Sequence, residues 1–554
     1  MSTLYIYNSR SDKQLLNLTD VYIYNINSGN INNVNSQNIN DSKRLHEIAL
    51  EQRDTYSEYI YSLNSKYLEN ELIYDERLSL YFISDLSGKR TALFKTYISI
   101  CHIILIQEKL KNKKINRVII DGCTLKFIQS IKSIFSTHEV EVLNSLKENL
   151  FIFNYLLKQL LFYIKTLCKW FIIKINMVGK IDKRSINNLY LTRFPMHFDS
   201  QFREEKYGDL LNEDDFYLIS VITDGLHQNQ SLVQFIYNLK QLKFIKSPYI
   251  LLDAYLSFKD IIYSYFNSIK FLRYQLKFNS YKFYYNKINI TQYINHEINQ
   301  SFIRIPRLDL YKNSIIEIFK SSKVNNFIYY LHEFSYGRFF TYILSNYFPT
   351  VNKIGFQHGA PSRRTLLCYL AESEPAYSNN DYFKFLPMPN EIYTENEFFK
   401  SIYEEAGYKN VSIMKNIPRL KYLSNIKRIN IVNNTILIAC GMHDYRYFID
   451  HCLDEIYSNL NFNYIFKFHP KTNYDSFADK INRYKFKNLK VGDKHISVYL
   501  SYVSEVIVSY SSVGYEAYCL GIPVKVKCLP NRINESPLLD LFKSNSSLIT
   551  IDYN

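Results

Sequence analysis

The chain has 554 residues, of which 47% are hydrophobic and 21% charged, a composition typical of a soluble globular protein with two or more domains. Its formal net charge of +15 is compatible with nucleic acid, an anionic membrane surface or acidic substrates as partners. No zinc-finger, basic-zipper or RNA-binding signature organises that charge, so we expect no nucleic-acid partner. The eight cysteines form no CxxC pair, and the first residues are not a basic segment followed by an apolar core; both features predict a cytoplasmic protein.

The first part of the chain alternates short β-rich runs with polar or helical stretches. Strands are predicted at Leu4 to Tyr7, Val21 to Ile26 and Val118 to Asp121, and the Asn-rich segment from Asn25 to Asn40 is predicted to be a surface loop. This alternation is typical of a doubly wound α/β domain. Further strands are expected at Leu189 to Leu191, Tyr217 to Val221, Phe327 to Leu331 and Lys353 to Phe356. We interpret residues 1–425 as one large N-terminal Rossmann-like domain.

A helical insertion is predicted in this domain at about residues 142–180. Four lysines inside its apolar core, Leu150 to Lys180, argue against a membrane-spanning helix, because each would cost roughly 2.5–3.5 kcal/mol at a bilayer centre. In a helix that turns about 100° per residue, most lysine and asparagine side chains of this segment fall within an arc of about 60°, whereas Lys174 lies outside it. The rest of the helix surface is a broad apolar face that includes Trp170. The polar arc consists of Asn154, Lys158, Lys165, Lys169 and Asn176. This pattern predicts a helix on the cytoplasmic membrane surface; the alternative is a helix buried in the domain with its lysines extended to solvent.

A second α/β domain is predicted for residues 426–554. A polar stretch from Lys421 to Asn434 precedes it, and Thr435-Ile-Leu-Ile-Ala-Cys-Gly441 begins it with a strand that ends in glycine. Strands and helices then alternate as far as a strand at Val524. Two unequal α/β domains that face each other across a cleft constitute the GT-B architecture, which is the fold we expect.

Two segments of the second domain predict a site for a phosphorylated ligand. Tyr464-Ile-Phe-Lys-Phe-His-Pro470 places His469 at the carboxyl end of a strand, where open parallel sheets bind ligands, and Pro470 ends that strand. After the next buried strand, Ser511 and Ser512 are able to cap a helix and to donate hydrogen bonds to a phosphate. The alternative is a helix cap without a ligand. The remaining residues of the predicted donor-binding set are Gly441, Lys467 and Glu516, the last expected at ribose hydroxyls.

The N-terminal domain supplies the candidates for acid–base chemistry. Glu333 follows a predicted strand, and a partly dry cleft would raise its pKa toward the range of a general base; the alternatives are a helix cap or an ion pair with Arg338. Asp224, after another predicted strand, is the rival base. His358 directly follows a further strand within Gln357-His358-Gly359, where the glycine permits a tight turn.

Substrate contacts are expected close to that turn. Gln357 belongs to the turn, and Arg363 and Arg364 lie just beyond it, where they would meet an acidic substrate. No metal-ligand spacing occurs in the sequence, so no catalytic metal is expected.

In these motifs the chain resembles a family of bacterial surface-carbohydrate biosynthesis proteins with a GT-B fold. That family is related more distantly to bacterial sialyltransferases, to Kdo transferases and to the polyol-phosphate transferases of teichoic acid synthesis. The resemblance runs from about Asn188 to Val526. Its most specific segments are Gly355 to Gly359, Leu386 to Ile392, Glu405 to Tyr408, Lys467 to Pro470 and Ser511 to Ala517. The related families favour an acidic pair followed by glycine at the base, whereas this chain has His332-Glu333-Phe334.

The resemblance implies an inverting, metal-independent glycosyltransferase that needs no cofactor. His469, Ser511 and Ser512 would hold the phosphate of a CMP-linked 3-deoxy-ulosonic acid, a sialic acid- or Kdo-like sugar, while Glu333 deprotonates the acceptor. The implied acceptor is a lipopolysaccharide or capsule glycan at the inner face of the membrane. Two alternatives keep the fold: a CDP-polyol phosphotransferase with His358 as the base, and a catalytically silent partner in a polysaccharide assembly.

Overall fold

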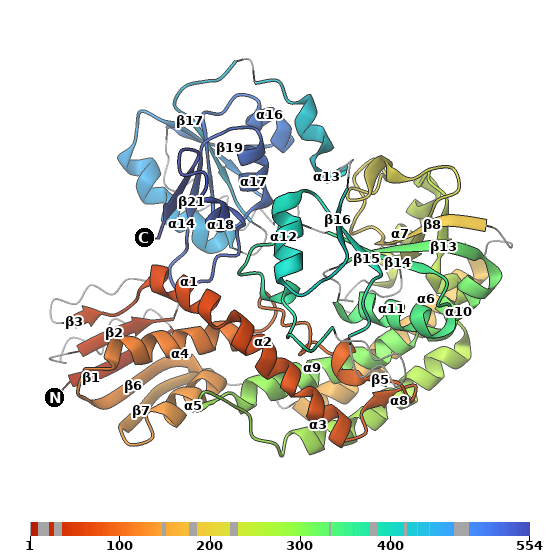
Figure 1. Cartoon of the computed structure of the whole chain (residues 1–554), viewed down its shortest axis with the longest axis horizontal. Helices are drawn as coiled ribbons and strands as arrows, with labels where there is room; N and C mark the ends of the chain where they lie inside the picture. Colours follow the sequence, from red (N-terminus) through yellow and green to blue (C-terminus); the bar gives the residue numbers. More distant parts are fainter. Residues whose placement is uncertain are drawn as a thin grey trace.

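The computed structural model describes most of the chain. It covers residues 2–8, 21–26, 36–146, 151–176, 185–221, 231–331, 334–357, 359–375, 386–414, 418–428, 430–441, 444–469, 472 and 487–553. Within these ranges the longer strands form three parallel sheets with helices packed around them, so the fold class is α/β, as predicted (Figure 1). We call them the N-terminal, central and C-terminal sheets.

The N-terminal sheet has the strand order β3-β2-β1-β6-β7. Its strands are β1 (Ser2–Tyr7), β2 (Val21–Asn25), β3 (Ser36–Asn38), β6 (Ile115–Thr124) and β7 (Glu139–Leu146). The accompanying helices are α1 (Ser42–Glu51), α2 (Arg53–Ser62), α3 (Asn64–Glu69), α4 (Thr96–Leu110) and α5 (Leu125–Ile134). The predicted Asn-rich loop therefore contains the short edge strand β3.

The central sheet has the order β10-β9-β8-β13-β14-β15-β16. Its strands are β8 (Ser185–Arg193), β9 (Phe216–Ser220), β10 (Tyr249–Leu251), β13 (Lys323–Tyr330), β14 (Asn352–Phe356), β15 (Glu391–Thr394) and β16 (Val411–Ile413). Its helices are α6 (Phe151–Asn176), α7 (Leu232–Gln241), α8 (Phe258–Phe278), α9 (Thr291–Asp309), α10 (Lys312–Ser321), α11 (Phe334–Tyr347) and α12 (Glu397–Glu405). Two short hairpins accompany it, β4 (Ile73–Tyr74) with β5 (Leu78–Ser79) and β11 (Tyr284–Tyr285) with β12 (Ile288–Asn289).

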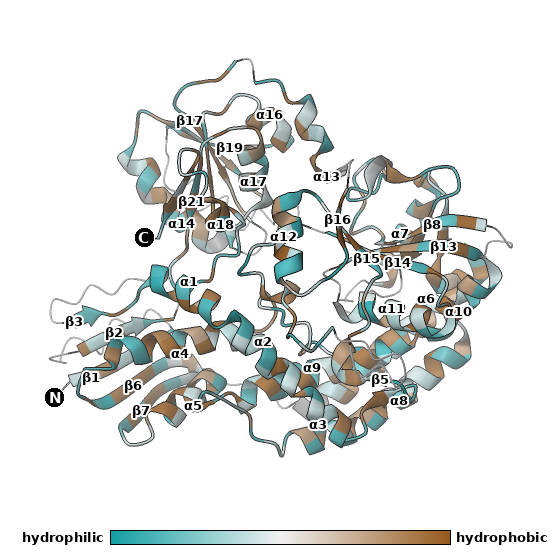
Figure 2. Cartoon of the chain, in the orientation of Figure 1, coloured by the Kyte–Doolittle hydropathy of each residue, from teal (hydrophilic) through white to brown (hydrophobic). Residues whose placement is uncertain are grey.

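The C-terminal sheet has the order β19-β18-β17-β20-β21-β22. Its strands are β17 (Thr435–Ala439), β18 (Asn463–Lys467), β19 (Leu489–Val491), β20 (Glu505–Val508), β21 (Val524–Lys527) and β22 (Ile549–Asp552). Its helices are α13 (Pro418–Lys421), α14 (Tyr445–Ser458), α16 (Ile496–Leu500), α17 (Ser512–Cys519) and α18 (Leu538–Leu541). In Figure 2 the strands of the C-terminal sheet are mainly brown, whereas many helices alternate brown and teal, because only one face of such a helix meets the core.

The strands of residues 1–425 are divided between two sheets, whereas we interpreted this region as one large domain. Buried side chains of both sheets, from Leu4 to Val411, nevertheless belong to one continuous hydrophobic core, and those of the C-terminal sheet form separate cores. Strands and helices alternate in the same way within a sheet and between two sheets, so the sequence pattern could not assign strands to sheets. The predicted boundary near residue 425 falls between the central and C-terminal sheets and stays a prediction.

Helix α6 packs on a face that differs from the predicted one. Tyr155 Oη donates to the carbonyl oxygen of Ser268 at 2.6 Å, and Trp170 Nε1 donates to that of Leu256 at 2.8 Å. Lys169, expected on the exposed polar arc, is buried, with its ammonium 5.3 Å from the ring centroid of Phe235 in α7. Side chains with polar atoms therefore face the interior of the domain, where they contact neighbouring segments.

The opposite face of α6 exposes a stripe of aliphatic and aromatic side chains. They are Leu156, Leu157, Leu160, Leu161, Ile164, Phe171 and Ile175. Lys158 and Lys165 are exposed beside this stripe. Among the described residues, no helix is long and apolar enough to cross a bilayer.

Candidate active site

The predicted donor-binding residues lie at the carboxyl edge of the C-terminal sheet. Gly441 follows β17, Lys467 is the last residue of β18, and Ser511 follows β20. Strands β17 and β20 are neighbours in the sheet, paired from Ile436 with Glu505 to Ala439 with Val508. From β17 the chain proceeds outward to β18 and β19, and from β20 it proceeds the other way, so the switch in topology lies between β17 and β20. Open α/β sheets bind their ligands at this switch point.

Helix α17 begins at this switch point, and its N-cap side chain is not used for capping. Ser511 is its N-cap residue, but the Ser511 side chain makes no capping hydrogen bond. By contrast, the N-cap hydroxyls of Ser231 and Ser257 accept hydrogen bonds from the first turns of α7 and α8. A Cβ on Gly514 would lie 2.7 Å from Cγ2 of Val508, so glycine lets the helix start directly against β20. A helix N-terminus beside a serine hydroxyl is suited to an anion, and anion binding at Ser511 stays a prediction.

His469 and Lys467 come from the adjacent strand end. His469 is partly exposed, and its carbonyl oxygen accepts a hydrogen bond from the backbone N–H of Thr472 at 2.8 Å. Lys467 Nζ is 3.5 Å from the carbonyl oxygen of Gly492, next to β19. Pro470 lies outside the described residues.

Glu516 is buried inside α17 and already has a protein partner. The hydroxyl of Tyr422 donates to its Oε2 at 2.6 Å. The predicted contact with ribose hydroxyls stays a prediction; it would have to share the carboxylate with this hydrogen bond.

A pocket of about 830 Å³ adjoins the carboxyl edge of the C-terminal sheet. Asp444, which follows β17, and Ser509 and Tyr510, which follow β20, line it from this sheet. The opposite wall contains Asn8, which follows β1, and Thr124, which ends β6. The order β3-β2-β1-β6-β7 places the topological switch of the N-terminal sheet between β1 and β6. The switch points of the N-terminal and C-terminal sheets therefore face each other across one pocket.

Asp444 is a buried titratable residue in the lining of this pocket. Its side chain is 1% exposed, and burial raises its pKa to about 6, although the Ser509 hydroxyl and the Arg532 charge favour the ionised form. A Cβ on Gly441 would stand 2.7 Å from Asp444 Oδ1, so glycine at 441 leaves room for the carboxyl group. A carboxyl group that titrates near neutral pH beside a pocket is suited to acid–base chemistry or ligand binding.

The predicted catalytic residues Glu333, His358 and Asp224 all lie outside the described residues. In sequence they follow β13, β14 and β9 of the central sheet. Gly359, beside His358, has a φ of 86°, a left-handed conformation that favours glycine.

The carboxyl edge of the central sheet contacts the C-terminal domain through α12. Asn396 Nδ2 donates to Tyr515 Oη of α17 at 2.6 Å, and the rings of Phe399 and Tyr515 are 5.0 Å apart. The N-terminal and central sheets therefore both adjoin the C-terminal domain.

The residues predicted to contact substrate have protein partners in the structure, and their contact with a substrate stays a prediction. Gln357 is buried; its Nε2 donates to the carbonyl oxygen of Gly359 at 2.7 Å, and its Oε1 accepts from the backbone N–H of Glu395 at 3.0 Å. Both ends of its amide thus hold the turn after β14. A substrate contact for Gln357 would have to use the second N–H of Nε2 or the second lone pair of Oε1, or replace one of these hydrogen bonds.

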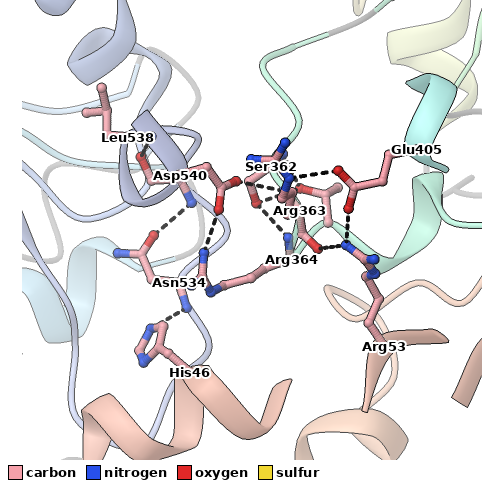
Figure 3. A network of polar contacts seen from close by, with 11 residues as sticks. His46, Arg53, Ser362, Arg363, Arg364, Glu405, Asn534, Leu538 and Asp540 are labelled. Atoms are coloured by element: carbon pink, nitrogen blue, oxygen red, sulfur yellow. Dashed lines mark hydrogen bonds and ion pairs between the residues drawn. The ribbon is translucent and has the colours of Figure 1, made fainter. Parts of the chain in front are cut away.

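Arg363 and Arg364 belong to a polar network between domains (Figure 3). Arg364 Nη1 is 2.9 Å from Oδ1 of Asp540 in α18, and Arg363 Nε is 2.8 Å from Oε2 of Glu405. In the same view, the backbone N–H of Asn534 donates to His46 Nε2 at 2.9 Å. The network joins all three parts of the chain, so in the structure these arginines fix the arrangement of domains.

Several pocket residues were not singled out in the sequence. Asp444 and Arg532 each follow a predicted strand by a few residues, which is a signal that could have found them. Lys95 and His102 come from α4 and its N-cap, and no sequence pattern connects them with the C-terminal domain. His102 is buried, and burial lowers its pKa to about 4. Among the described residues, no group of three or more His, Cys, Asp or Glu side chains is arranged to hold a metal ion.

No protein-family model matches the sequence, and no curated protein matches it significantly. Solved structures with a similar arrangement include the wall teichoic acid polymerase TagF, which is 11% identical, with 68% of this chain and 79% of that chain covered and a TM-score of 0.28. The glycotransferase of kitacinnamycin is 9% identical over 67% of this chain and 87% of that chain, with a TM-score of 0.35. UDP-N-acetylglucosamine 2-epimerase from Rickettsia bellii is 10% identical, with 65% of this chain and 87% of that chain covered and a TM-score of 0.31.

Proposed function

We propose that the chain is a glycosyltransferase that uses a nucleotide-sugar donor. The observation that carries the proposal is the start of α17, where the Ser511 side chain makes no capping hydrogen bond and the switch point of the sheet adjoins a pocket of about 830 Å³. Pockets of this size hold ligands as large as a nucleotide sugar. A helix N-terminus with a hydroxyl group favours the phosphate of such a donor.

The proposed chemistry is an inverting, metal-independent transfer. The acceptor hydroxyl attacks the anomeric carbon, the bond from that carbon to the donor phosphate breaks, and the acceptor proton passes to Glu333. His469 and the α17 terminus stabilise the negative charge that develops on the departing phosphate. The contact between α12 and α17 supports this division of roles, since it brings the carboxyl edge of the central sheet to the donor side.

The proposed donor is a CMP-linked 3-deoxy-ulosonic acid, and the proposed acceptor is a bacterial lipopolysaccharide or capsule glycan. This finer proposal is supported by the family resemblance of the segments around Gln357, His469 and Ser511. The net charge of +15 agrees with acidic substrates.

Donor binding tests the proposal directly. We expect His469→Ala, Ser511→Ala and Ser512→Ala each to weaken the binding of CMP or the matching nucleotide by about 1.5–3 kcal/mol, roughly 10- to 150-fold, since charge-assisted hydrogen bonds are lost. Isothermal titration calorimetry with CMP, CDP, UDP and GDP measures this. His138→Ala, before β7, and Ser544→Ala, after α18, are matched controls outside the pocket lining and should bind like the wild type. Unchanged affinity in all three site variants would contradict the assignment.

Product analysis separates the two chemistries. For glycosyl transfer, Glu333→Gln should abolish turnover and keep donor affinity, because a general base acts in the transition state. A phosphodiester in the product, together with an active Glu333→Gln variant and an inactive His358→Ala variant, would favour the polyol phosphotransferase. Nucleotide binding without turnover of any donor would favour the silent assembly partner.

The proposed location is the inner membrane face, and α6 is the element that would bind it. Its aliphatic stripe spans Leu156 to Ile175, a length of about 28 Å at 1.5 Å per residue, with Lys158 and Lys165 exposed alongside. An apolar stripe flanked by lysines is complementary to an anionic lipid surface.

Vesicle flotation tests this location. Lys158→Glu with Lys165→Glu should weaken binding to anionic vesicles by at least about 2 kcal/mol, roughly 30-fold, because each lysine contributes about 1 kcal/mol. Lys111→Glu with Lys113→Glu, at the end of α4, makes the same charge change as a control. Wild-type protein that stays unbound with anionic vesicles at low salt would reject the membrane site.

A further inference from the structure

Two cations from different domains line the same pocket. Lys95 is the N-cap residue of α4, which packs with the N-terminal sheet, and Arg532 lies in the loop after β21 of the C-terminal sheet. The Arg532 guanidinium is stacked 3.8 Å from the ring centroid of Tyr447, which also lines the pocket. The two side chains thus approach one volume from opposite walls.

The loop that carries Arg532 is held firmly against the N-terminal domain. Thr91 Oγ1 donates to Glu535 Oε1 at 2.6 Å, and Asn40 Nδ2 donates to Asn531 Oδ1 at 2.7 Å. These contacts are on both sides of Arg532 in the sequence. The position of Arg532 relative to Lys95 is therefore fixed before any ligand arrives, which lowers the cost of ordering the site on binding.

The charges around the two cations are not balanced within the protein. Across the part of the chain that the structure describes, neither Lys95 nor Arg532 has an ion pair. Burial and the nearby Arg532 charge lower the pKa of Lys95, while Glu535 acts in the opposite direction. Of the described residues that line the pocket, Lys95, Lys126 and Arg532 are cationic and Asp444 and Glu535 are acidic, and the pKa of each acid is raised. An anion between Lys95 and Arg532 would relieve their repulsion.

We infer that Lys95 and Arg532 form an anion-binding site in which the N-terminal and C-terminal sheets hold one ligand between them. The ligand class is a molecule with a phosphate or carboxylate group, large enough to fill a pocket lined by the rings of Tyr293, Tyr447 and Tyr510. The N-terminal sheet is then part of the ligand-binding unit. Lys95 and Arg532 line the pocket that the proposed donor site adjoins, but the pair includes neither Ser511 nor His469. The inference does not depend on which reaction the chain catalyses.

Binding measurements with two small probes test the inference. Inorganic phosphate is the probe for a ligand with a phosphate group. N-acetylneuraminate, a sugar acid, is the probe for a ligand with a carboxylate group. We expect the wild-type protein to bind at least one of them, and Lys95→Ala and Arg532→Ala each to weaken that binding by about 10-fold or more. Lys111→Ala changes the same residue type at the other end of α4 and should leave the affinity unchanged.

The outcomes distinguish this site from the proposed donor site. Probe binding that depends on Lys95 and Arg532 but survives Ser511→Ala supports the inference, even if no sugar transfer is ever observed. Circular dichroism and a thermal melt establish that each variant is folded; because Lys95→Met keeps the aliphatic chain, it replaces Lys95→Ala if the latter unfolds. Wild-type protein that binds neither probe at millimolar concentration, or variants that bind as the wild type does, would overturn the inference.

Discussion

Replacing Asp540 by alanine should destabilise the protein by about 3–5 kcal/mol, the largest effect expected from a single change at the domain contacts. Asp540 Oδ1 is 2.9 Å from Arg364 Nη1, its Oδ2 accepts from the backbone N–H of Arg363 at 2.8 Å, and the side chains of Arg364 and Asp540 are 10% and 5% exposed. The change leaves a buried guanidinium without its partner, which is why the cost exceeds that of a surface pair.

Denaturant unfolding measures the loss of stability, and hydrogen exchange shows which segments it affects. Exchange should accelerate in residues 359–375 and 529–541, where the pair connects the central and C-terminal parts. Glu69→Ala breaks the exposed Lys66–Glu69 pair and should change the stability little, because water screens an exposed pair. Arg364→Met combined with Asp540→Leu should be much milder than Asp540→Ala, because no buried charge is left unpaired. Equal losses for Asp540→Ala and Glu69→Ala would show that the buried pair contributes little.

Asp444→Asn should make the protein more stable at neutral pH, by up to about 3 kcal/mol. The pKa of Asp444 is raised from 3.8 to about 6 by burial, so between these values the folded protein binds more protons than the unfolded chain. Stability contributed by this group is therefore present at low pH and is lost as pH rises through that window. Asparagine cannot ionise, so the variant keeps this stability at pH 7.5 and gains little at pH 4.

The measurement is the free energy of unfolding of wild type and variant across pH 4–8. Asp493→Asn is the control, because backbone hydrogen bonds and Tyr499 lower the pKa of Asp493, so its removal should not stabilise the protein at neutral pH. A wild type and an Asp444→Asn variant with parallel pH profiles would contradict the raised pKa. A stabilised variant that binds ligand poorly would mark Asp444 as a residue kept for function at the expense of stability.

Much of the local structure could be predicted from the sequence. The predicted strands at Leu4 to Tyr7, Tyr217 to Val221 and Lys353 to Phe356 match β1, β9 and β14 closely, and His469 and Ser511 lie at carboxyl ends of strands as expected. Such features depend on residues close together in the chain, namely apolar runs, turn residues and helix caps. The roles of His469 and Ser511 in binding remain predictions.

The arrangement of strands in space could not be predicted in the same way. No sequence pattern connected Arg364 with its partner Asp540, which lies 176 positions further along the chain. The predicted substrate contact of Arg364 stays a prediction. Helix α6 was expected to expose Lys169, yet that lysine is buried beside Phe235, because the hydrogen bonds of Tyr155 and Trp170 fix the rotation of the helix.

The sequence by itself determined the α/β class, most strand positions and the residues at the carboxyl edge of the C-terminal sheet. Only the tertiary structure decided that the N-terminal sheet faces this edge, with Lys95 and Arg532 in one pocket. The physical reason is that periodicity reports which face of an element is buried, not which other element buries it. Contacts such as Thr91 with Glu535 join segments hundreds of residues apart, and they come from the packing of whole domains.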